Sequence, residues 1–294
     1  MRTVCIHAFT VVLVSLAIGF AQTLGPGSSA LHSAAMFGSA DAVQARLLLS
    51  SEGVDTRDVE GRTPLMIGSA FNTDPGVVAV LIDAGADVDA CSFDGWNPLS
   101  LAARYNSNLD VLRAILDAGA DVNGHCGDGW TALMNAASFN PDPRAVVMLV
   151  SAGADVHFRE HEGYSVIFRA AGNNPEPSVI QALVDAGADV NSPGPMNDTP
   201  LIIAAGLNPV AGVITVLVEA GASIDAQATP GWTALMFAAG YNPNPNVLRA
   251  LLDAGADVKL RDTSGRRAID YARDNPSVLG SVAFWILEDA TMRR

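Results

Sequence analysis

Positive charge is scarce in this sequence. Its 294 residues include 17 basic side chains, only one of them Lys, against 31 acidic ones, and the formal net charge is -14. A surface of this sign repels phosphate backbones and anionic lipid headgroups, so we expect no nucleic acid among the partners. The field would attract basic proteins, although solubility through self-repulsion is the simpler explanation.

The residue patterns of known catalytic sites are also missing. The chain has five His residues, and none lies in a nucleophile, phosphate-loop or metalloprotease pattern. Its Asp and Glu residues follow a repeat in which helix capping and turns explain them. Because a catalytic site needs groups that converge in one pocket, we predict no enzyme activity and no cofactor.

Cysteine is equally scarce, with three in the chain. Cys5 lies in an apolar N-terminal segment, which leaves Cys91 and Cys126 on neighbouring turns of the repeat described below, one position out of register. A disulfide between them requires their Cα atoms to come within about 7 Å. We keep this pair as a candidate disulfide.

Four residues imitate a zinc-binding set: His125, Cys126, His157 and His161, the last two spaced as His-x3-His. They lack a CxxC pair and occupy different positions on their turns, so we interpret the histidines as exposed loop residues and predict no metal site. A metal-dependent module or hydrolase remains the alternative.

A long apolar run occurs at the N-terminus. Met1 and Arg2 precede the apolar residues 9–20, and Gly19 and Ala21 are small residues of the kind found before a signal-peptidase cut. We predict a signal peptide over residues 1–21, cleaved after Ala21, followed by a linker over 22–30.

Two alternatives to this processing remain. Ser28 and Ala30 allow a second cut after Ala30, and the stretch 4–21 is nearly long enough to act as an uncleaved anchor. Arg2 is the only basic residue before the run, so general secretion is the expected route. The preference for Arg over Lys and the high Ala content fit a GC-rich bacterium, which makes the expected location periplasmic or secreted, with no stable membrane insertion after cleavage.

The remaining chain repeats with a step of 34 residues. Gly-Ala-Asp or Gly-Ala-Ser begins at Gly85, Gly119, Gly153, Gly187, Gly221 and Gly255. An Asn-containing turn follows the same step, as FNTDP from Phe71, YNSNL from Tyr105, FNPDP from Phe139, NNPEP from Asn173, LNPVA from Leu207 and YNPNP from Tyr241. A fixed period of this length indicates stacked supersecondary units.

The first half of each unit predicts a short helix. In the unit from Gly61, Thr63 is a good N-cap and Pro64 suits the first helical position. The helix must end by Asn72, which we expect in the left-handed conformation usually given to Gly, as at Gly38 one unit earlier.

The second half predicts another helix and a projecting turn. Asp74 caps this helix, Pro75 begins it and Gly85 ends it. Residues 86–95 then alternate and end in a turn signal, as expected of a short β-hairpin, with Asn197 replacing the turn Gly of one unit at a position of positive φ. Each unit is therefore helix, turn, helix and hairpin.

These patterns closely resemble the ankyrin-repeat family. The resemblance rests on GRTPL from Gly61, on the recurring GADV, and on the pairs Ala102-Ala103, Ala136-Ala137, Ala170-Ala171, Ala204-Ala205 and Ala238-Ala239. It implies an all-α repeat fold, a solenoid of helix-turn-helix units with short β-hairpin loops, over residues 31–290, with a tail at 291–294. The two ends look like caps and give about eight units.

Two features depart from the family pattern. The period exceeds the usual length of about 33 residues, and we place the extra residue in the Asn-containing turn. The His expected after TPL is retained only as His32. Its equivalents in the regular units are Met66, Ser100, Met134, Phe168, Ile202 and Met236.

Two rows of mostly aromatic residues are the candidate binding residues. The resemblance places the first row, Trp96, Trp130, Tyr164 and Trp232, on a concave face that contacts partners, with Arg62, Asp198 and Arg266 interrupting it. The second row precedes the end of the first helix and contains Phe37, Phe71, Tyr105, Phe139, Leu207 and Tyr241. Aromatic residues anchor interfaces. The alternative is that each ring only packs across a joint between units.

The sequence therefore predicts an exported, non-catalytic scaffold that binds an unknown partner protein on its concave face. An inhibitor or immunity-type protein that blocks a secreted enzyme is the alternative, favoured if acidic hairpin tips carry the binding.

Overall fold

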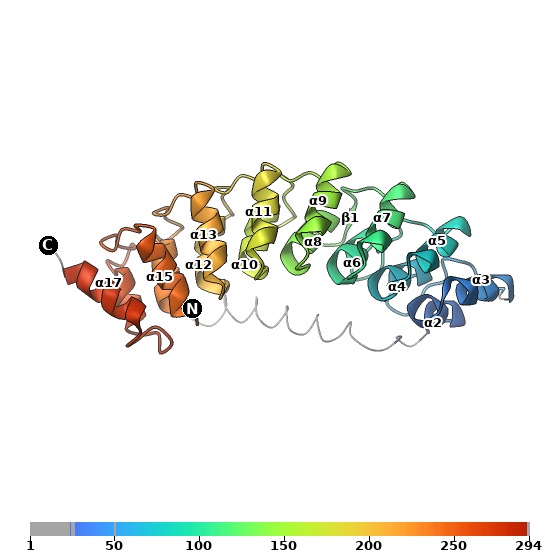
Figure 1. Cartoon of the computed structure of the whole chain (residues 1–294), viewed down its shortest axis with the longest axis horizontal. Helices are drawn as coiled ribbons and strands as arrows, with labels where there is room; N and C mark the ends of the chain where they lie inside the picture. Colours follow the sequence, from blue (N-terminus) through green and yellow to red (C-terminus); the bar gives the residue numbers. More distant parts are fainter. Residues whose placement is uncertain (1–23, 25–26, 50, 293–294) are drawn as a thin grey trace.

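The computed structural model describes residue 24, residues 27–49 and residues 51–292, and in this part of the chain it contains eight consecutive helix pairs (Figure 1). The first helices of the pairs are α2 (Ala30–Phe37), α4 (Pro64–Phe71), α6 (Pro98–Tyr105), α8 (Ala132–Phe139), α10 (Val166–Asn173), α12 (Pro200–Leu207), α14 (Ala234–Tyr241) and α16 (Ala268–Ala272). The second helices are α3 (Ala40–Leu49), α5 (Pro75–Asp83), α7 (Leu109–Asp117), α9 (Pro143–Ser151), α11 (Pro177–Asp185), α13 (Ala211–Glu219), α15 (Pro245–Asp253) and α17 (Val282–Met292). The predicted all-α repeat is confirmed.

The pairs stack in a single row. Each first helix packs on the first helices before and after it, and each second helix does the same, so the molecule has two parallel layers of helices. The row is gently arched, with the first helices on the inner side and the second helices on the outer side (Figure 1). The predicted signal peptide lies outside the described residues. Among the helices of the described residues, none has the length and apolar character needed to cross a membrane.

Small residues in the first helices allow the close stacking. The predicted Ala pairs are buried, and Ala136 and Ala137 are completely inaccessible. Branched residues of the second helices, such as Leu149 and Leu183, close the core between the layers. Each unit therefore buries its apolar surface against its neighbours, as expected of a solenoid.

The helix starts follow the predicted capping chemistry. The Thr63 hydroxyl accepts a hydrogen bond from the Met66 N–H at 3.3 Å, and Pro64 is the first residue of α4. At α9, a carboxylate oxygen of Asp142 accepts from the Arg144 N–H at 2.9 Å, and Pro143 follows the cap. Both caps satisfy backbone donors that have no partner within the helix.

The helix-ending asparagines do not have the predicted left-handed conformation. Asn72 has φ -94° and ψ 125°, and Gly38 is also extended, so that prediction was wrong. The side chain explains the choice of Asn. Asn174 Nδ2 donates to the carbonyl oxygens of Ala137 and Asn140, each at 2.9 Å, and its Oδ1 accepts from the Glu176 N–H at 2.9 Å.

This arrangement recurs along the stack and forms a buried asparagine ladder. Its members are Asn72, Asn106, Asn140, Asn174, Asn208, Asn242 and Asn275, each of which donates to the unit before it. Asn197, by contrast, has φ 58°, as predicted for the residue that replaces a turn Gly.

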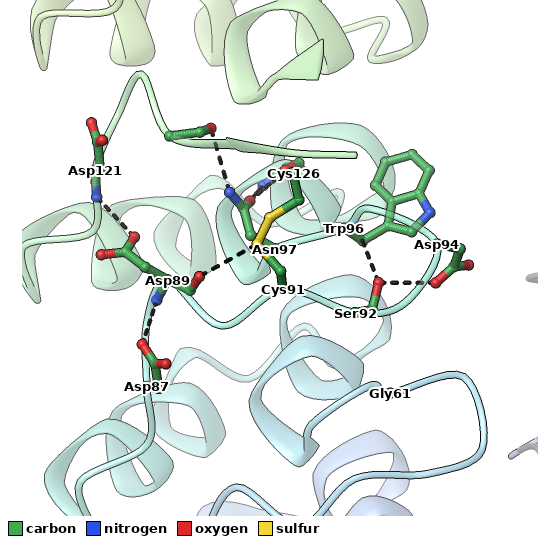
Figure 2. Close-up of a disulfide and its surroundings, with 12 residues drawn as sticks. Gly61, Asp87, Asp89, Cys91, Ser92, Asp94, Trp96, Asn97, Asp121 and Cys126 are labelled. Carbon is green, nitrogen blue, oxygen red and sulfur yellow. Dashed lines mark hydrogen bonds between the residues drawn. A yellow bond between two sulfur atoms is a disulfide. The ribbon is translucent and has the colours of Figure 1, made fainter. Parts of the chain in front are cut away.

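The predicted hairpins form regular strand pairs in few units. In the described residues, β1 (His125–Cys126) pairs antiparallel with β2 (Trp130–Thr131), and isolated bridges join Arg159 to Ser165 and Ala228 to Trp232. Elsewhere side chains help to close the turns. For example, the Ser92 hydroxyl accepts from the Trp96 N–H at 3.0 Å (Figure 2).

A disulfide joins two neighbouring turns (Figure 2). Cys91 and Cys126 are bonded through their sulfur atoms, and their Cα atoms are 6.0 Å apart. This separation lies within the usual range for a disulfide.

Candidate partner-binding surface

The backbone places the first aromatic row at a constant point in every unit. Each residue of the row follows a turn glycine with positive φ, such as Gly95 at 86° or Gly129 at 84°, and directly precedes the N-cap of a first helix. The glycine is needed because L side chains rarely adopt this conformation. All four residues, Trp96, Trp130, Tyr164 and Trp232, are half-buried.

The second row packs on the first within the same unit. Trp96 lies beside Tyr105 with ring centroids 6.1 Å apart, and Trp130 stacks on Phe139 at 5.8 Å. Trp232 stacks on Tyr241 at 5.5 Å. We call the eight residues Phe71, Trp96, Tyr105, Trp130, Phe139, Tyr164, Trp232 and Tyr241 the aromatic stripe.

Some stripe rings also bridge neighbouring units. Phe71 and Tyr105 lie on successive first helices with centroids 6.3 Å apart, and Trp232 meets Tyr271 of the following unit at 5.0 Å. The rings therefore pack across joints between units, as the alternative interpretation of these rows proposed. They are also partly exposed, up to 42% at Tyr241. Phe37, at the start of the second row, is 73% exposed.

Sequence reasoning missed the arginines that stack on these rings. The guanidinium carbon of Arg104 lies 3.4 Å from the Phe139 ring centroid, and that of Arg169 lies 4.5 Å from the Tyr164 centroid. Their signal in the sequence is a charged residue inside an otherwise apolar first helix. A guanidinium plane on an aromatic face is a favourable contact.

Arg169 is neutralised within the chain. It is buried and pairs with the buried Glu160 at 2.9 Å and with the exposed Glu162 at 2.5 Å. Two other arginines interrupt the first aromatic row, and both form ion pairs: Arg62 with Asp58 at 2.7 Å and Arg266 with Asp274 at 2.8 Å. These three arginines therefore have a structural explanation.

Several polar groups of the stripe and its surroundings are partly removed from water. Burial raises the pKa of the Tyr105 and Tyr164 hydroxyls above the usual value and lowers the pKa of the Arg104 guanidinium. Burial also raises the pKa of Asp198, which interrupts the row beside Tyr164. Polar contacts made at such a surface are stronger than in bulk water.

Several acidic residues near the turns take part in hydrogen bonds that hold the stack together. Carboxylate oxygens of Asp55, Asp89 and Asp225 accept from backbone N–H groups of the following unit, at distances from 2.8 to 3.2 Å (Asp89 in Figure 2). From the sequence, we explained the many acidic residues by helix capping and turn closure. The structure adds a third role, which is hydrogen bonding between neighbouring units.

Two residues of the imitated zinc set, His125 and His161, lie together, but the set does not form a metal-binding group. Cys126 is in the disulfide and is not a thiolate, the form of cysteine that binds metal. The His125 ring contacts Phe158 and His161, with centroids 5.5 and 5.7 Å apart. Within the described residues, no three His, Cys, Asp or Glu side chains are grouped as a metal would require.

Comparison with known proteins gives one consistent result. A family model described as ankyrin repeats (3 copies) matches residues 9–90, 68–160 and 133–228, and a second, ankyrin repeats (many copies), matches residues 217–272. The ankyrin-repeat domain of human ASB11 has a similar structure, with a TM-score of 0.65, 22% identity, and coverage of 78% of this chain and 99% of that one. At this identity the likeness concerns the fold alone. No curated protein sequence matches significantly.

Proposed function

Because this chain belongs to the ankyrin-repeat family, we propose that it is an exported, non-catalytic scaffold that binds a partner protein on the inner side of its arch. Ankyrin repeats are generally protein–protein interaction modules, and the proteins that contain them are typically non-catalytic. The fold positions a surface and does not identify its ligand. The specific proposal therefore depends on the residues of that surface.

The observation that carries the proposal is the aromatic stripe. It places half-buried Trp, Tyr and Phe rings beside the first helices of successive units, held by turn glycines, caps and mutual stacking. Rings fixed in this way lose little conformational entropy on binding. Trp and Tyr are also the residues most enriched at binding hot spots.

The test is a pull-down from the exported fraction with residues 22–294 as bait. We compare the unchanged chain with the triple variant Trp96→Ala, Trp130→Ala and Trp232→Ala. The control variant carries Phe93→Ala and Trp285→Ala, two aromatic residues that are 78% and 58% exposed and lie outside the stripe. Helical content and the melting temperature of every variant are measured by circular dichroism.

A partner retained by the control but lost by the folded triple variant supports the proposal. A partner held equally by all three chains contradicts it and directs attention to the acidic turns, as the inhibitor alternative requires. The triple variant must keep its helical content, because the three Trp rings also pack on neighbouring rings.

Export is tested separately by the mass and N-terminal sequence of the protein in its native host. We propose cleavage after Ala21, so the mature chain should begin at Gln22. A chain beginning at Leu31 would identify the second cleavage site. Uncleaved protein found with the membranes would contradict cleavage and favour the anchor.

A further inference from the structure

Arg104 occupies a helix position at which the other first helices from α2 to α14 have no charge. One residue before the end of the first helix, the equivalent residues are Met36, Ala70, Ser138, Gly172, Gly206 and Gly240. The repeat can therefore be built with a small or apolar residue at this point. Arg104 is the exception.

At three other joints the space beside this position is filled by a neutral side chain of the next unit, which is Ile203 beside Gly172 and an aromatic ring at the other two. A Cβ added at Gly206 would lie 2.7 Å from the Phe237 ring, and one at Gly240 would lie 3.4 Å from Tyr271. At the joint between α6 and α8 the filling side chain is Arg104. It extends over Phe139, and its Nη1 donates to Asn135 Oδ1 at 3.4 Å. Neutral side chains fill this space at those three joints. The need to fill it therefore does not explain why a guanidinium is present here.

Among the residues that the structure describes, the Arg104 charge has no counter-ion within ion-pair distance. Within the described residues no carboxylate forms an ion pair with it, whereas two other arginines that stack on aromatic rings are paired: Arg169 with two carboxylates and Arg266 with one. The favourable electrostatic partners of Arg104 are the Tyr105 hydroxyl and, more weakly and from beyond ion-pair distance, Asp128. The Arg104 Nε, like that of Arg169, is buried and has no acceptor in the same part of the chain.

Three stripe rings surround this charge. Its guanidinium carbon lies 5.5 Å from the Trp96 centroid and 5.2 Å from that of Tyr105, in addition to its close contact with Phe139. Stacking occupies the faces of a guanidinium and leaves its edges for hydrogen bonds in the plane. Carboxylates match this edge in shape and charge.

We propose that Arg104, together with Trp96, Tyr105 and Phe139, binds an aspartate or glutamate side chain of the partner protein. The inference rests on the proposed function, because these rings belong to the aromatic stripe. It adds the chemistry of the ligand: an acidic side chain next to an apolar one, the first reaching the guanidinium edge and the second the rings. The strongly acidic surface of this chain elsewhere would disfavour such a ligand, so binding is confined to this point.

The experiment measures binding of residues 22–294 to an array of ten-residue peptides with amidated C-termini. The peptides come in pairs that differ only by Glu or Gln at the centre, with Leu or Phe on either side. Because charge-assisted hydrogen bonds to a partly buried group are strong, we expect the best Glu peptides to bind about 10- to 100-fold more tightly than their Gln partners. Fluorescence anisotropy gives the affinities.

Arg104→Gln should abolish this preference. Arg113→Gln, which removes an exposed arginine of α7, should retain it. Arg104→Met keeps an unbranched side chain in the joint, so a folded Arg104→Met chain without Glu preference shows that the loss does not come from an unfilled joint. Circular dichroism confirms the fold of each variant.

Absence of a Glu preference in the unchanged chain, including absence of binding, overturns the inference, as does a preference that survives Arg104→Gln. A third arm uses Gln peptides with free C-termini. If only these free-ended peptides bind in a way that depends on Arg104, the ligand is a chain-terminal carboxylate, and the assignment to an acidic side chain is overturned. A pulled-down partner lost by the triple Trp variant but kept by Arg104→Gln would overturn this inference and leave the proposed function intact.

Discussion

At the scale of single residues, buried amides tie the units of this protein together. Asn174 is 1% exposed, yet its side chain satisfies two backbone carbonyls of the preceding unit and one N–H of its own turn. Buried polar groups are costly unless they are hydrogen-bonded. The ladder therefore fixes how each unit stacks on the unit before it, because any other arrangement would leave these buried groups without hydrogen bonds.

Removing one ladder amide should destabilise the fold. We expect Asn174→Ala to lower the free energy of unfolding by about 2 to 4 kcal/mol, because the carbonyls of Ala137 and Asn140 would be left buried without that donor. Urea unfolding followed by circular dichroism measures the change. Asn246→Ala, at an exposed position of α15, is the matched control and should change stability by less than about 0.5 kcal/mol. Equal effects of the two substitutions would contradict the role of the ladder.

One tyrosine links stability to alkaline pH. Burial and a hydrogen bond donated to Asp262 raise the pKa of Tyr271 to about 12. Since its pKa in the unfolded chain is about 10, the contribution is complete below that pH and is lost as the pH rises through the folded value.

Tyrosinate absorbance is followed during a pH titration of the folded chain. Among the tyrosines that ionise before the chain unfolds, Tyr271 should ionise last. Tyr271→Phe should remove that step and flatten the loss of thermal stability above about pH 10. An unchanged titration curve in Tyr271→Phe would contradict the assignment.

At the scale of elements, one turn position links several of the units to the next. Arg57 Nη1 donates to Gly61 O in its own turn and to Cys91 O in the next, at 2.8 and 2.6 Å. Arg159 makes the equivalent bonds to Gly163 and Pro193, both at 2.7 Å. Cys91 occupies this same position and makes the connection with a covalent bond.

Loss of the disulfide should destabilise the surrounding units. The bonded cysteines are 35 residues apart, and the chain-entropy model gives about 3 to 4 kcal/mol for a loop of this size. We expect dithiothreitol to lower the melting temperature of the unchanged chain. The variant Cys91→Ser, Cys126→Ser should melt at the lower temperature with or without reductant. No response of the unchanged chain to dithiothreitol would show that the pair is not bridged in solution.

At the scale of the whole molecule, the stack is nearly one-dimensional, since contacts run between successive pairs. Its ends are less well covered than its middle. Leu48 and Leu49 of α3 are 77% and 83% exposed, and Val282 of α17 is 69% exposed. Such terminal units have a neighbour on one side only.

Backbone amides should therefore exchange with solvent fastest at the two ends. Hydrogen–deuterium exchange followed by mass spectrometry should show the lowest protection in α2, α3, α16 and α17 and the highest in α8 to α13, because opening a central unit breaks two interfaces. Uniform protection along the chain would instead indicate that the eight pairs unfold as one cooperative unit.

Most of the fold could be predicted because its signals are local. The caps at Thr63 and Asp142 involve backbone within three residues, and the glycine of each turn is required by its own φ. The role of Asn72 could not be predicted this way, since its side chain bonds to Ala35 and Gly38, 37 and 34 residues earlier. The positions of the candidate binding residues were predicted, but their stacking and the joint that Arg104 fills depend on the facing unit.

By itself, the sequence determined the helix pairs, their boundaries, their number and the family, because capping, turn chemistry and a fixed period act within one unit. Only the tertiary structure decided what lies between units: the asparagine ladder, the disulfide, the ion pairs of Arg169, and an Arg104 charge with no ion-pair partner among the described residues. The physical reason is that these contacts form across joints. A charged or polar side chain at a joint finds a partner only if the stacking brings a suitable residue of the neighbouring unit against it.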